Sequence, residues 1–147
     1  MAETVEYCLL SGNKKIINIV MIKNFLIISC TGKNDKIGLK VDNSFFMHNF
    51  QTKIQNNDKL VDTIYNFTKK HEVQLNKDFC ILVNYGPGSF SSVRAALTVA
   101  KGIKVATNVK LFGFKNSDLP RFSLENIEIL INKDLLEKNL IKPLYLS

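Results

Sequence analysis

The chain has 147 residues, 46% hydrophobic and 22% charged, a composition typical of one globular domain, and this excludes disorder as its main description. A formal net charge of +7 raises nucleic-acid binding as a function, but the only arginines, which bidentate phosphate contacts favour, are Arg94 and Arg121, and the 18 lysines are scattered. The cysteines are three in number and widely spaced, which excludes a disulfide framework or a zinc site. With no signal peptide or membrane span recognisable either, we expect a cytoplasmic protein that does not bind a membrane.

The first twenty residues show no clear period and are followed by a second methionine, Met21. We expect residues 1–20 to be an N-terminal extension of doubtful origin, for which two interpretations stay open. One is an upstream addition or a mobile arm, with translation naturally starting at Met21. The other is a genuine extra strand, built on Ile16, Ile17, Ile19 and Val20.

From Met21 onward, apolar runs and alternation predict three strands, a helix, a strand, a helix and a strand. The strands are expected at Phe25–Cys30, Lys36–Val41, Phe45–Phe50, Phe79–Asn84 and Val109–Phe114. The helices are expected at Asn57–His71, with Asn57 or Asp58 as N-cap, and at about Ser91–Thr107. The short turns between the first three strands favour an antiparallel meander that opens a mixed sheet, and the whole is an α/β fold with covering helices. Beyond Phe114 the signals weaken to a loop and an apolar run, Ile127–Ile131.

A Gly-Pro-Gly turn at residues 86–88 joins a buried strand to the long helix, a geometry in which backbone N–H groups can hold an anion. Two phosphate-binding motifs fail the comparison. A P-loop needs a Gly-Lys-Ser/Thr that is absent here. A dinucleotide fingerprint needs a small residue where Ser91 stands and an acid after the next strand, and no acid ends that strand.

The helix that follows this turn is apolar around most of its circumference. Its polar residues Arg94, Thr98 and Lys101 form one narrow stripe. The small residues Ala95, Ala96, Ala100 and Gly102 would allow another helix to approach closely. We interpret part of this apolar face as a contact with a protein partner; the alternative is burial under the chain's own elements.

The segment Gly86-Pro87-Gly88-Ser89-Phe90-Ser91-Ser92-Val93-Arg94, followed by Ala100-Lys101-Gly102, closely resembles the GPGSFTGxR…AKG segment of the TsaB (YeaZ) family. The flanking strands also match, and Pro143-Leu144-Tyr145-Leu146 resembles the C-terminal PxYL tail of that family. The resemblance implies a ribonuclease-H-like lobe of the actin/Hsp70 type over residues 21–115. It implies that residues 116–147 are a residual C-terminal segment in place of most of the second lobe.

The chain also departs from the family pattern. Ile28-Ser29-Cys30-Thr31 stands where the family's first strand usually ends in Ile-Asp-Thr-Ser, so a carboxylate that could hold Mg²⁺ is missing. Asn56-Asn57-Asp58 replaces the usual His-Ser-Glu, and Ser91-Ser92 replaces Thr-Gly.

The resemblance implies a non-catalytic subunit that binds the catalytic subunit TsaD as a heterodimer, with the ATPase TsaE joining the complex. TsaD transfers a threonylcarbamoyl group to the adenosine next to the anticodon, so tRNA is a substrate of the complex only. A further alternative is that the chain forms a homodimer when TsaD is absent. The expected partner-binding residues are Val93, Ala96, Leu97, Ala100, Lys101, Leu60, Ile64 and Phe67, and the expected motif loop comprises Gly86, Pro87, Gly88, Ser89, Phe90 and Arg94. We accordingly expect Ala96→Glu to abolish TsaD binding by a folded monomer.

No catalytic set is recognisable, and we expect no metal or cofactor. His48 and His71 have no partner in sequence and are expected to be surface or capping histidines. Two alternatives to the scaffold remain. One is a nucleotide-binding or glycoprotease-like enzyme of the same superfamily, and the other is a weak RNA-binding module that uses the +7 charge.

Overall fold

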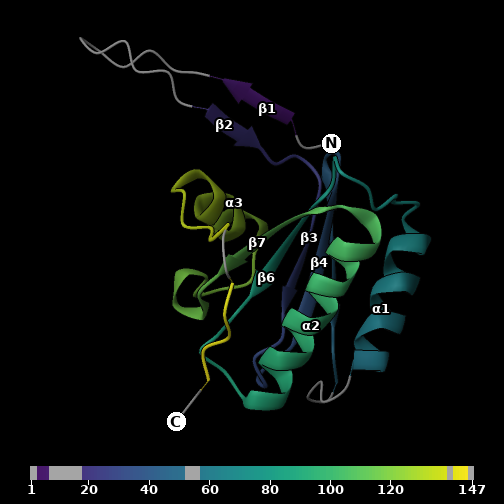
Figure 1. The fold of residues 1–147 in the computed structure, drawn as a ribbon, viewed down its shortest axis with the longest axis vertical. Coiled ribbons are helices and arrows are strands. Elements are labelled where there is room, and N and C mark those ends of the chain that lie inside the picture. The colour runs from purple at the N-terminus through teal and green to yellow at the C-terminus, as the bar shows by residue number, and fades with distance from the viewer. Residues whose placement is uncertain (1–2, 7–17, 52–56, 139–140, 146–147) are drawn as a thin grey trace.

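A five-stranded mixed sheet forms the centre of the fold (Figure 1). The structure is a computed structural model and describes residues 3–6, 18–51, 57–138 and 141–145. In spatial order the strands are β5 (Ser44–Asn49), β4 (Lys36–Val41), β3 (Phe25–Ser29), β6 (Cys80–Asn84) and β7 (Lys110–Phe114). The first three pair antiparallel, whereas β3–β6 and β6–β7 are parallel. The predicted α/β class and the antiparallel meander of a mixed sheet are confirmed, and the strand boundaries lie within one residue of those predicted.

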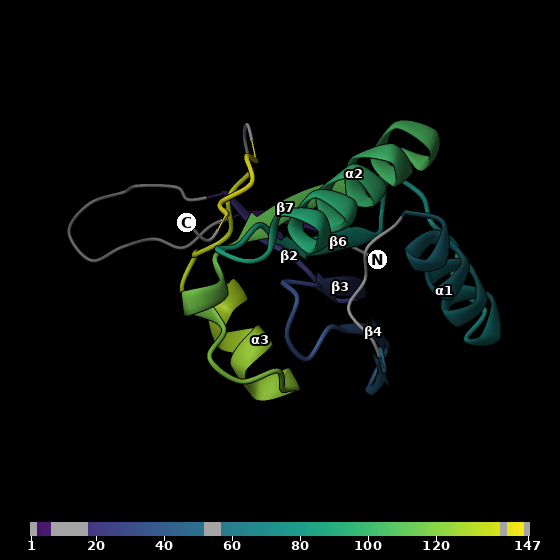
Figure 2. The same cartoon turned by 90° about the horizontal axis from the view of Figure 1, so that it is seen from below.

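Helices cover both faces of this sheet (Figure 2). α1 (Asn57–Lys70) and α2 (Phe90–Thr107) pack on one face, and α3 (Leu124–Asn132) packs on the other. Alternation along β3 divides its side chains between the two cores, because successive residues of a strand point to opposite faces. Leu26 and Ile28 join α1 and α2, while Phe25 and Ile27 join α3.

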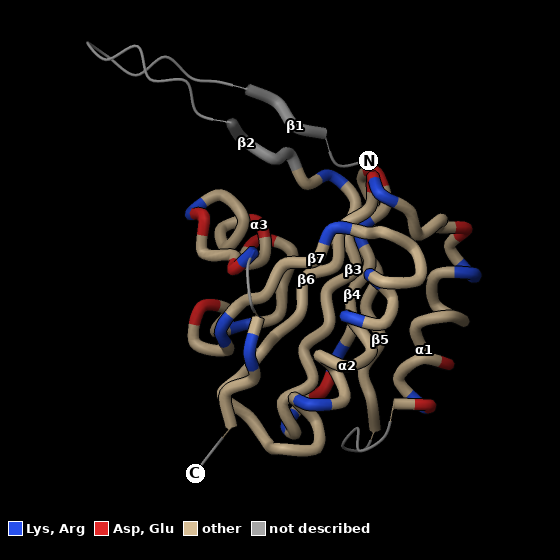
Figure 3. The backbone as a smooth tube through the Cα atoms, in the orientation of Figure 1, with Lys and Arg blue, Asp and Glu red and all other residues tan. Residues whose placement is uncertain are grey.

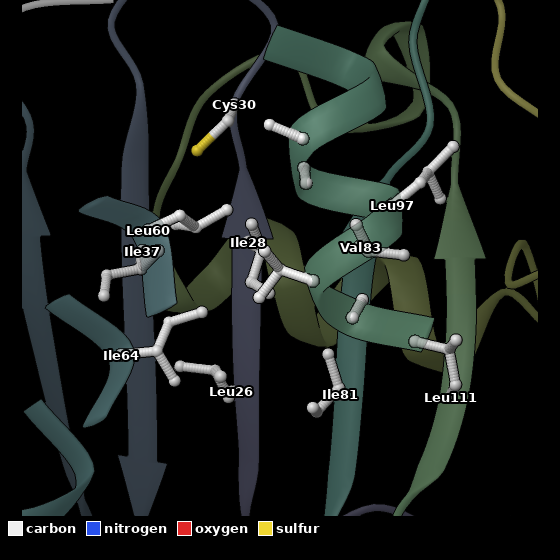
Figure 4. Packing of buried hydrophobic residues seen from close by; sticks show 14 of the residues in the cluster. Leu26, Ile28, Cys30, Ile37, Leu60, Ile64, Ile81, Val83, Leu97 and Leu111 are labelled. Atoms are coloured by element: carbon white, nitrogen blue, oxygen red, sulfur yellow. The ribbon is translucent and has the colours of Figure 1, made fainter. Parts of the chain in front are cut away.

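The core beneath α1 and α2 is built from helical side chains that follow the expected periods (Figure 4). α1 buries Leu60, Ile64 and Thr68, four residues apart each time, and these form its stripe toward the sheet. The prediction that Asn57 or Asp58 caps this helix is wrong, because the helix already begins at Asn57. Asp58 instead lies in the first turn, where a negative charge stabilises the helix dipole.

Three elements were not predicted: α3, a 3-10 turn before it, and β1. The apolar run at residues 127–131 belongs to α3, whose N-cap Ser123 accepts a hydrogen bond from the backbone N–H of Asn126 at 3.2 Å and which buries Ile127 and Leu130. A single 3-10 turn, Asn116–Asp118, precedes it. Near the N-terminus, β1 (Glu3–Glu6) and β2 (Asn18–Met21) pair antiparallel as a separate small sheet. The strand interpretation therefore holds for residues 18–20; Ile16 and Ile17 lie outside the described residues.

None of the helices in the described part of the chain combines the length and the apolar character that a membrane span requires.

Cys30 and Cys80 are fully buried free thiols, one in each core. Burial raises the pKa of Cys80 to about 11, against a partly opposing effect of Lys110, and burial together with the charge of Asp35 raises that of Cys30. We expect a thiol reagent such as DTNB to label both at pH 8 only as the chain unfolds, because the folded thiols are neutral as well as inaccessible. A Cys8→Ser variant restricts the assay to these two residues. Fast labelling in native buffer would contradict the packing described here.

Candidate functional site

The Gly-Pro-Gly loop lies where the parallel strands β3, β6 and β7 end, the edge at which open α/β sheets usually bind ligands. Asn84, the last residue of β6, is 1% exposed and organises this edge. Its amide nitrogen donates to Ser29 Oγ and Asn116 Oδ1, each at 3.1 Å, and its Oδ1 accepts the backbone N–H of Gly86 at 2.9 Å. This role of Asn84 was not predicted; the available signal was an amide side chain that ends an otherwise apolar strand.

The loop's backbone donors are occupied by the chain itself. Besides the Gly86 N–H, the N–H of Gly88 donates to the carbonyl of Leu144 at 3.2 Å, and that of Ser89 donates to the carbonyl of Thr31 at 2.9 Å. An anion cradle would need these donors free and turned toward the ligand. These three N–H groups therefore fasten the loop to β6, to the end of β3 and to the C-terminal segment.

Both glycines of the loop are required by its surroundings. Gly86 has a φ of +106°, and a Cβ there would overlap the carbonyl oxygen of Leu144. A Cβ on Gly88 would lie 2.7 Å from Cβ of Thr31 and 2.8 Å from Cγ2 of Val93. The glycines thus serve close approach between segments of this chain.

The C-terminal segment, residues 141–145, packs directly on the loop, so the two motifs that resemble TsaB lie side by side. The N–H of Leu144 donates to the carbonyl of Tyr85 at 2.8 Å, and Tyr145 forms a parallel bridge with Gly88. The ring of Tyr145 lies 4.8 Å from that of Phe90, between centroids. This contact between the motifs could not be read from the sequence; Leu146 lies outside the described residues.

Tyr85, whose carbonyl accepts the hydrogen bond from Leu144, also has a hydroxyl with a shifted pKa. Burial, and then the negative charges of Glu137 and Asp118, raise the pKa of Tyr85. Its hydroxyl therefore stays neutral at physiological pH.

Within the described residues no three His, Cys, Asp or Glu side chains come together as a metal site would require.

The structure corrects most of the predicted partner-binding residues. Val93, Ala96 and Ala100 are fully buried, Leu97 is 4% exposed, and Leu60 and Ile64 are 0% and 2% exposed, all in the chain's own core. Figure 4 shows Leu60, Ile64 and Leu97 over the strand side chains. These six side chains cannot form a surface for a partner, because almost none of their area is exposed to solvent. Phe67 is half-buried, and Lys101, although exposed, donates from Nζ to the carbonyl of Ile141 at 2.9 Å.

The outward side of the helical layer carries a different set of residues. α2 exposes the predicted polar stripe, including Arg94 and Thr98, and continues it through Gly102 and Val105, the latter 87% exposed. On α1, Val61 and Tyr65 are 45% and 60% exposed. We call these the outer helical face: Val61, Tyr65, Arg94, Thr98, Gly102 and Val105.

A hollow of about 550 Å³ lies at one end of the outer helical face, between the first turns of α1 and α2. Its lining includes Asp58 from α1 and Arg94 and Thr98 from α2. The guanidinium of Arg94 lies 5.4 Å from the centre of the Phe90 ring, which is 57% exposed. The outer helical face thus joins the motif loop through Phe90 and Arg94.

The two histidines pack on aromatic rings beside α1, a contact that was not predicted. His71 stacks on Phe46 with ring centroids 3.8 Å apart, and His48 meets the ring of Phe50 edge-on at 5.1 Å.

The lysines and arginines are distributed over many elements rather than gathered on one of them (Figure 3). This distribution agrees with the scattered lysines of the sequence.

Sequence comparison gives a match within the tRNA-modification proteins. The chain is 42% identical over 64 residues to "tRNA threonylcarbamoyladenosine biosynthesis protein TsaB" of Buchnera aphidicola subsp. Baizongia pistaciae (strain Bp), which covers 42% of this chain and 29% of that protein. No protein-family model matches the chain.

The fold is similar to two solved structures. One is YeaZ from Pseudomonas aeruginosa, with a TM-score of 0.58 and 18% identity over 65% of this chain and 46% of that one. The other is a protein with similarity to peptidase YeaZ, from Pseudomonas aeruginosa, with a TM-score of 0.57 and 19% identity over 67% and 44% of the two chains. The chain therefore spans less than half the length of each of these three proteins. The expected fold and the resemblance are confirmed: over the portion of those proteins that it spans, the chain is similar in sequence to TsaB and in fold to YeaZ.

Proposed function

We propose that this chain is a non-catalytic subunit in the biosynthesis of threonylcarbamoyladenosine on tRNA, and that it binds the catalytic subunit TsaD. The observation that carries the proposal is the 42% identity to TsaB over 64 residues. The Gly-Pro-Gly loop supports a role without nucleotide chemistry. The backbone N–H groups of Gly86, Gly88 and Ser89 already donate hydrogen bonds to acceptors within the chain. On this proposal tRNA is a substrate of the assembled complex, which TsaE joins.

The outer helical face is the surface through which we propose that TsaD binds. Val61, Tyr65 and Val105 give this face exposed apolar area. Thr98 and Gly102 have small side chains, so they do not project far from the helix between these apolar residues. A Cβ built on Gly102 meets no atom within 4 Å, so a helix of the partner can approach closely there. The basic Arg94 at the edge of this face favours a partner that presents acidic side chains around an apolar centre.

Thr98→Glu tests this proposal in the full-length chain. Thr98 is exposed at the middle of the outer helical face, so the substitution leaves the fold intact and places a charge in the contact. We expect isothermal titration with TsaD from the same organism to show binding weakened roughly thirtyfold or more, the effect of losing a hot spot of about 2 kcal/mol.

Ile129→Glu is the matched control, because Ile129 is 47% exposed on α3, across the sheet from the outer helical face. We expect it to bind TsaD like the unmodified chain. If the unmodified chain binds no TsaD while both proteins are folded, the proposed function is wrong. If both variants bind normally, the function stands and the surface is wrong.

A further inference from the structure

Two aromatic rings are exposed where the C-terminal segment meets the start of α2, two parts of the chain that Figure 1 shows close together. Phe90 is 57% exposed and Tyr145 is 39% exposed, and their ring centroids lie 4.8 Å apart. We call these two rings the aromatic platform. Arg94 packs on it, with its guanidinium carbon 5.4 Å from the centre of the Phe90 ring. Neither ring belongs to the two described hydrophobic cores, so the packing of the fold does not account for them.

Exposed lysines lie near the platform although they are far apart in the sequence. Three of them lie within two residues of a residue whose backbone is hydrogen-bonded to the motif loop. These pairs are Lys33 with Thr31, Lys115 with Asn116, and Lys142 with Leu144. The β3–β4 turn, the end of β7 and the C-terminal segment therefore each bring one cation to this edge of the sheet.

The charges at this edge favour a polyanion as the ligand. Asp35, the acid of the β3–β4 turn, is 3% exposed and accepts the backbone N–H of Gly32 at 2.9 Å, so its carboxylate is withdrawn from solvent. The negative charges of Asp118 and Glu137 act on Tyr85 and partly offset the lysines. The chain as a whole carries +7, and such a charge attracts phosphate groups without regard to their sequence. The aromatic rings must therefore supply the selectivity.

An unpaired nucleotide uses both parts of this surface at once. Unstacked bases stack on aromatic side chains, while the phosphates next to them are attracted by lysine and arginine. A base inside a duplex offers no free face for stacking, and an acidic peptide would use the cations without needing the rings. Exposed rings of Phe90 and Tyr145 among lysines from three segments therefore favour single-stranded RNA over a duplex and over an acidic protein.

We propose that unpaired bases of RNA stack on the aromatic platform, with Lys33, Lys115 and Lys142 close to the phosphates. The identification of this RNA as tRNA rests on the proposed function; the binding of a single strand does not. Arg94 packs on Phe90 and also belongs to the outer helical face, so the platform adjoins the surface proposed for TsaD. The chain would thus hold the substrate as well as the catalytic subunit.

Phe90→Leu and Tyr145→Leu test the platform, because leucine keeps an apolar side chain and removes the aromatic face. Tyr65→Leu is the matched control: Tyr65 is 60% exposed on α1 and has Lys69 Nζ 5.6 Å from its ring centre, but it lies outside the motif loop. We expect fluorescence anisotropy of the full-length chain to show a Kd on the order of 10–100 μM for a labelled single-stranded RNA of about twelve nucleotides. Each platform variant should weaken this binding about tenfold and the control should not. Binding of a duplex of the same sequence should respond to none of the three substitutions.

The lysines should give a different signature from the rings. Lys115→Gln and Lys142→Gln should each reduce the slope of log affinity against log salt by about 0.7, the value for one phosphate contact on a single strand. Lys69→Gln on α1 is their control and should leave the slope unchanged. Phe90→Leu and Tyr145→Leu should also leave it unchanged, because stacking releases no counterions.

Other outcomes would overturn the inference. A chain that binds no single-stranded RNA, or binds it equally well after both aromatic substitutions, has no such platform; if it still binds TsaD, the proposed function stands. RNA binding that depends on Phe90 and Tyr145 in a chain that binds no TsaD would instead leave the platform standing and contradict the proposed function. Poly-glutamate binding that depends on the two rings would assign them to a protein partner. Displacement of the RNA by micromolar adenosine monophosphate would assign them to a free nucleotide.

Discussion

Ala96→Glu should unfold or severely destabilise this protein rather than simply prevent partner binding. Ala96 is 0% exposed within the hydrophobic core that α2 shares with α1 and the sheet, so a carboxylate there would be withdrawn from water among apolar side chains. An unpaired buried charge costs about 3–5 kcal/mol, a large part of the stability of a small domain. We expect urea unfolding to show a loss of this size, or a chain that does not fold.

Thr98→Glu is the matched control, since it introduces the same charge two residues further along the same helix on an exposed position. We expect its free energy of unfolding to remain within about 0.5 kcal/mol of the unmodified chain. An Ala96→Glu protein as stable as Thr98→Glu would place Ala96 at the surface. It would restore the sequence-based prediction that Ala96 contacts the partner.

The error about Ala96 shows what periodicity can and cannot resolve. The sequence correctly predicts that α2 is buried over far more than one narrow side, but it does not say which segment covers each side. α1 packs along one flank of α2, and Ile141 joins the core of the same chain, with Lys101 holding its carbonyl. α1 and the C-terminal segment therefore both pack against the helix that was expected to meet a second protein, and no local signal predicts such long-range contacts.

The prediction succeeded for the sheet because its strands are long apolar or alternating runs between turns, and each lies within one residue of its expected place. It missed α3 because residues 127–131 are rich in isoleucine, which favours strands. What makes this segment helical is the Ser123 cap together with two buried side chains, Ile127 and Leu130, three residues apart. A weak local preference is overridden here by capping and packing.

At the candidate site, the sequence identified the glycine-rich loop by its resemblance but not the purpose of its glycines. A Gly-Pro-Gly turn before a helix is compatible with an anion site, and only the positions of Thr31 and Leu144 reveal that the N–H groups of Gly88 and Ser89 are already used. These partners lie more than fifty residues away along the chain in each case. Long-range pairing of this kind is what a single sequence cannot provide.

Gly86→Ala should release the C-terminal segment from the loop. At a φ of +106° alanine is strained, and its methyl group would overlap the Leu144 carbonyl, so Leu144 must move away from Tyr85 and Gly88. Strain and the loss of these hydrogen bonds should lower the free energy of unfolding by about 2–4 kcal/mol. We expect amide hydrogen exchange at Gly88 and Leu144 to accelerate by more than the exchange of the strands distant from the loop, whose protection falls only with the global free energy of unfolding.

Gly102→Ala is the control, and we expect it to raise the free energy of unfolding rather than lower it. Gly102 lies in α2 with open space where the methyl group would be, so alanine should stabilise the helix by about 0.5–1 kcal/mol. Because Gly102 also lies on the outer helical face, this variant keeps the fold while adding one methyl group where TsaD is proposed to approach. A Gly86→Ala chain that retains slow exchange at Leu144 would show that the segment is not held through Gly86. In that case the contact between the two TsaB-like motifs would not explain why glycine occupies this position.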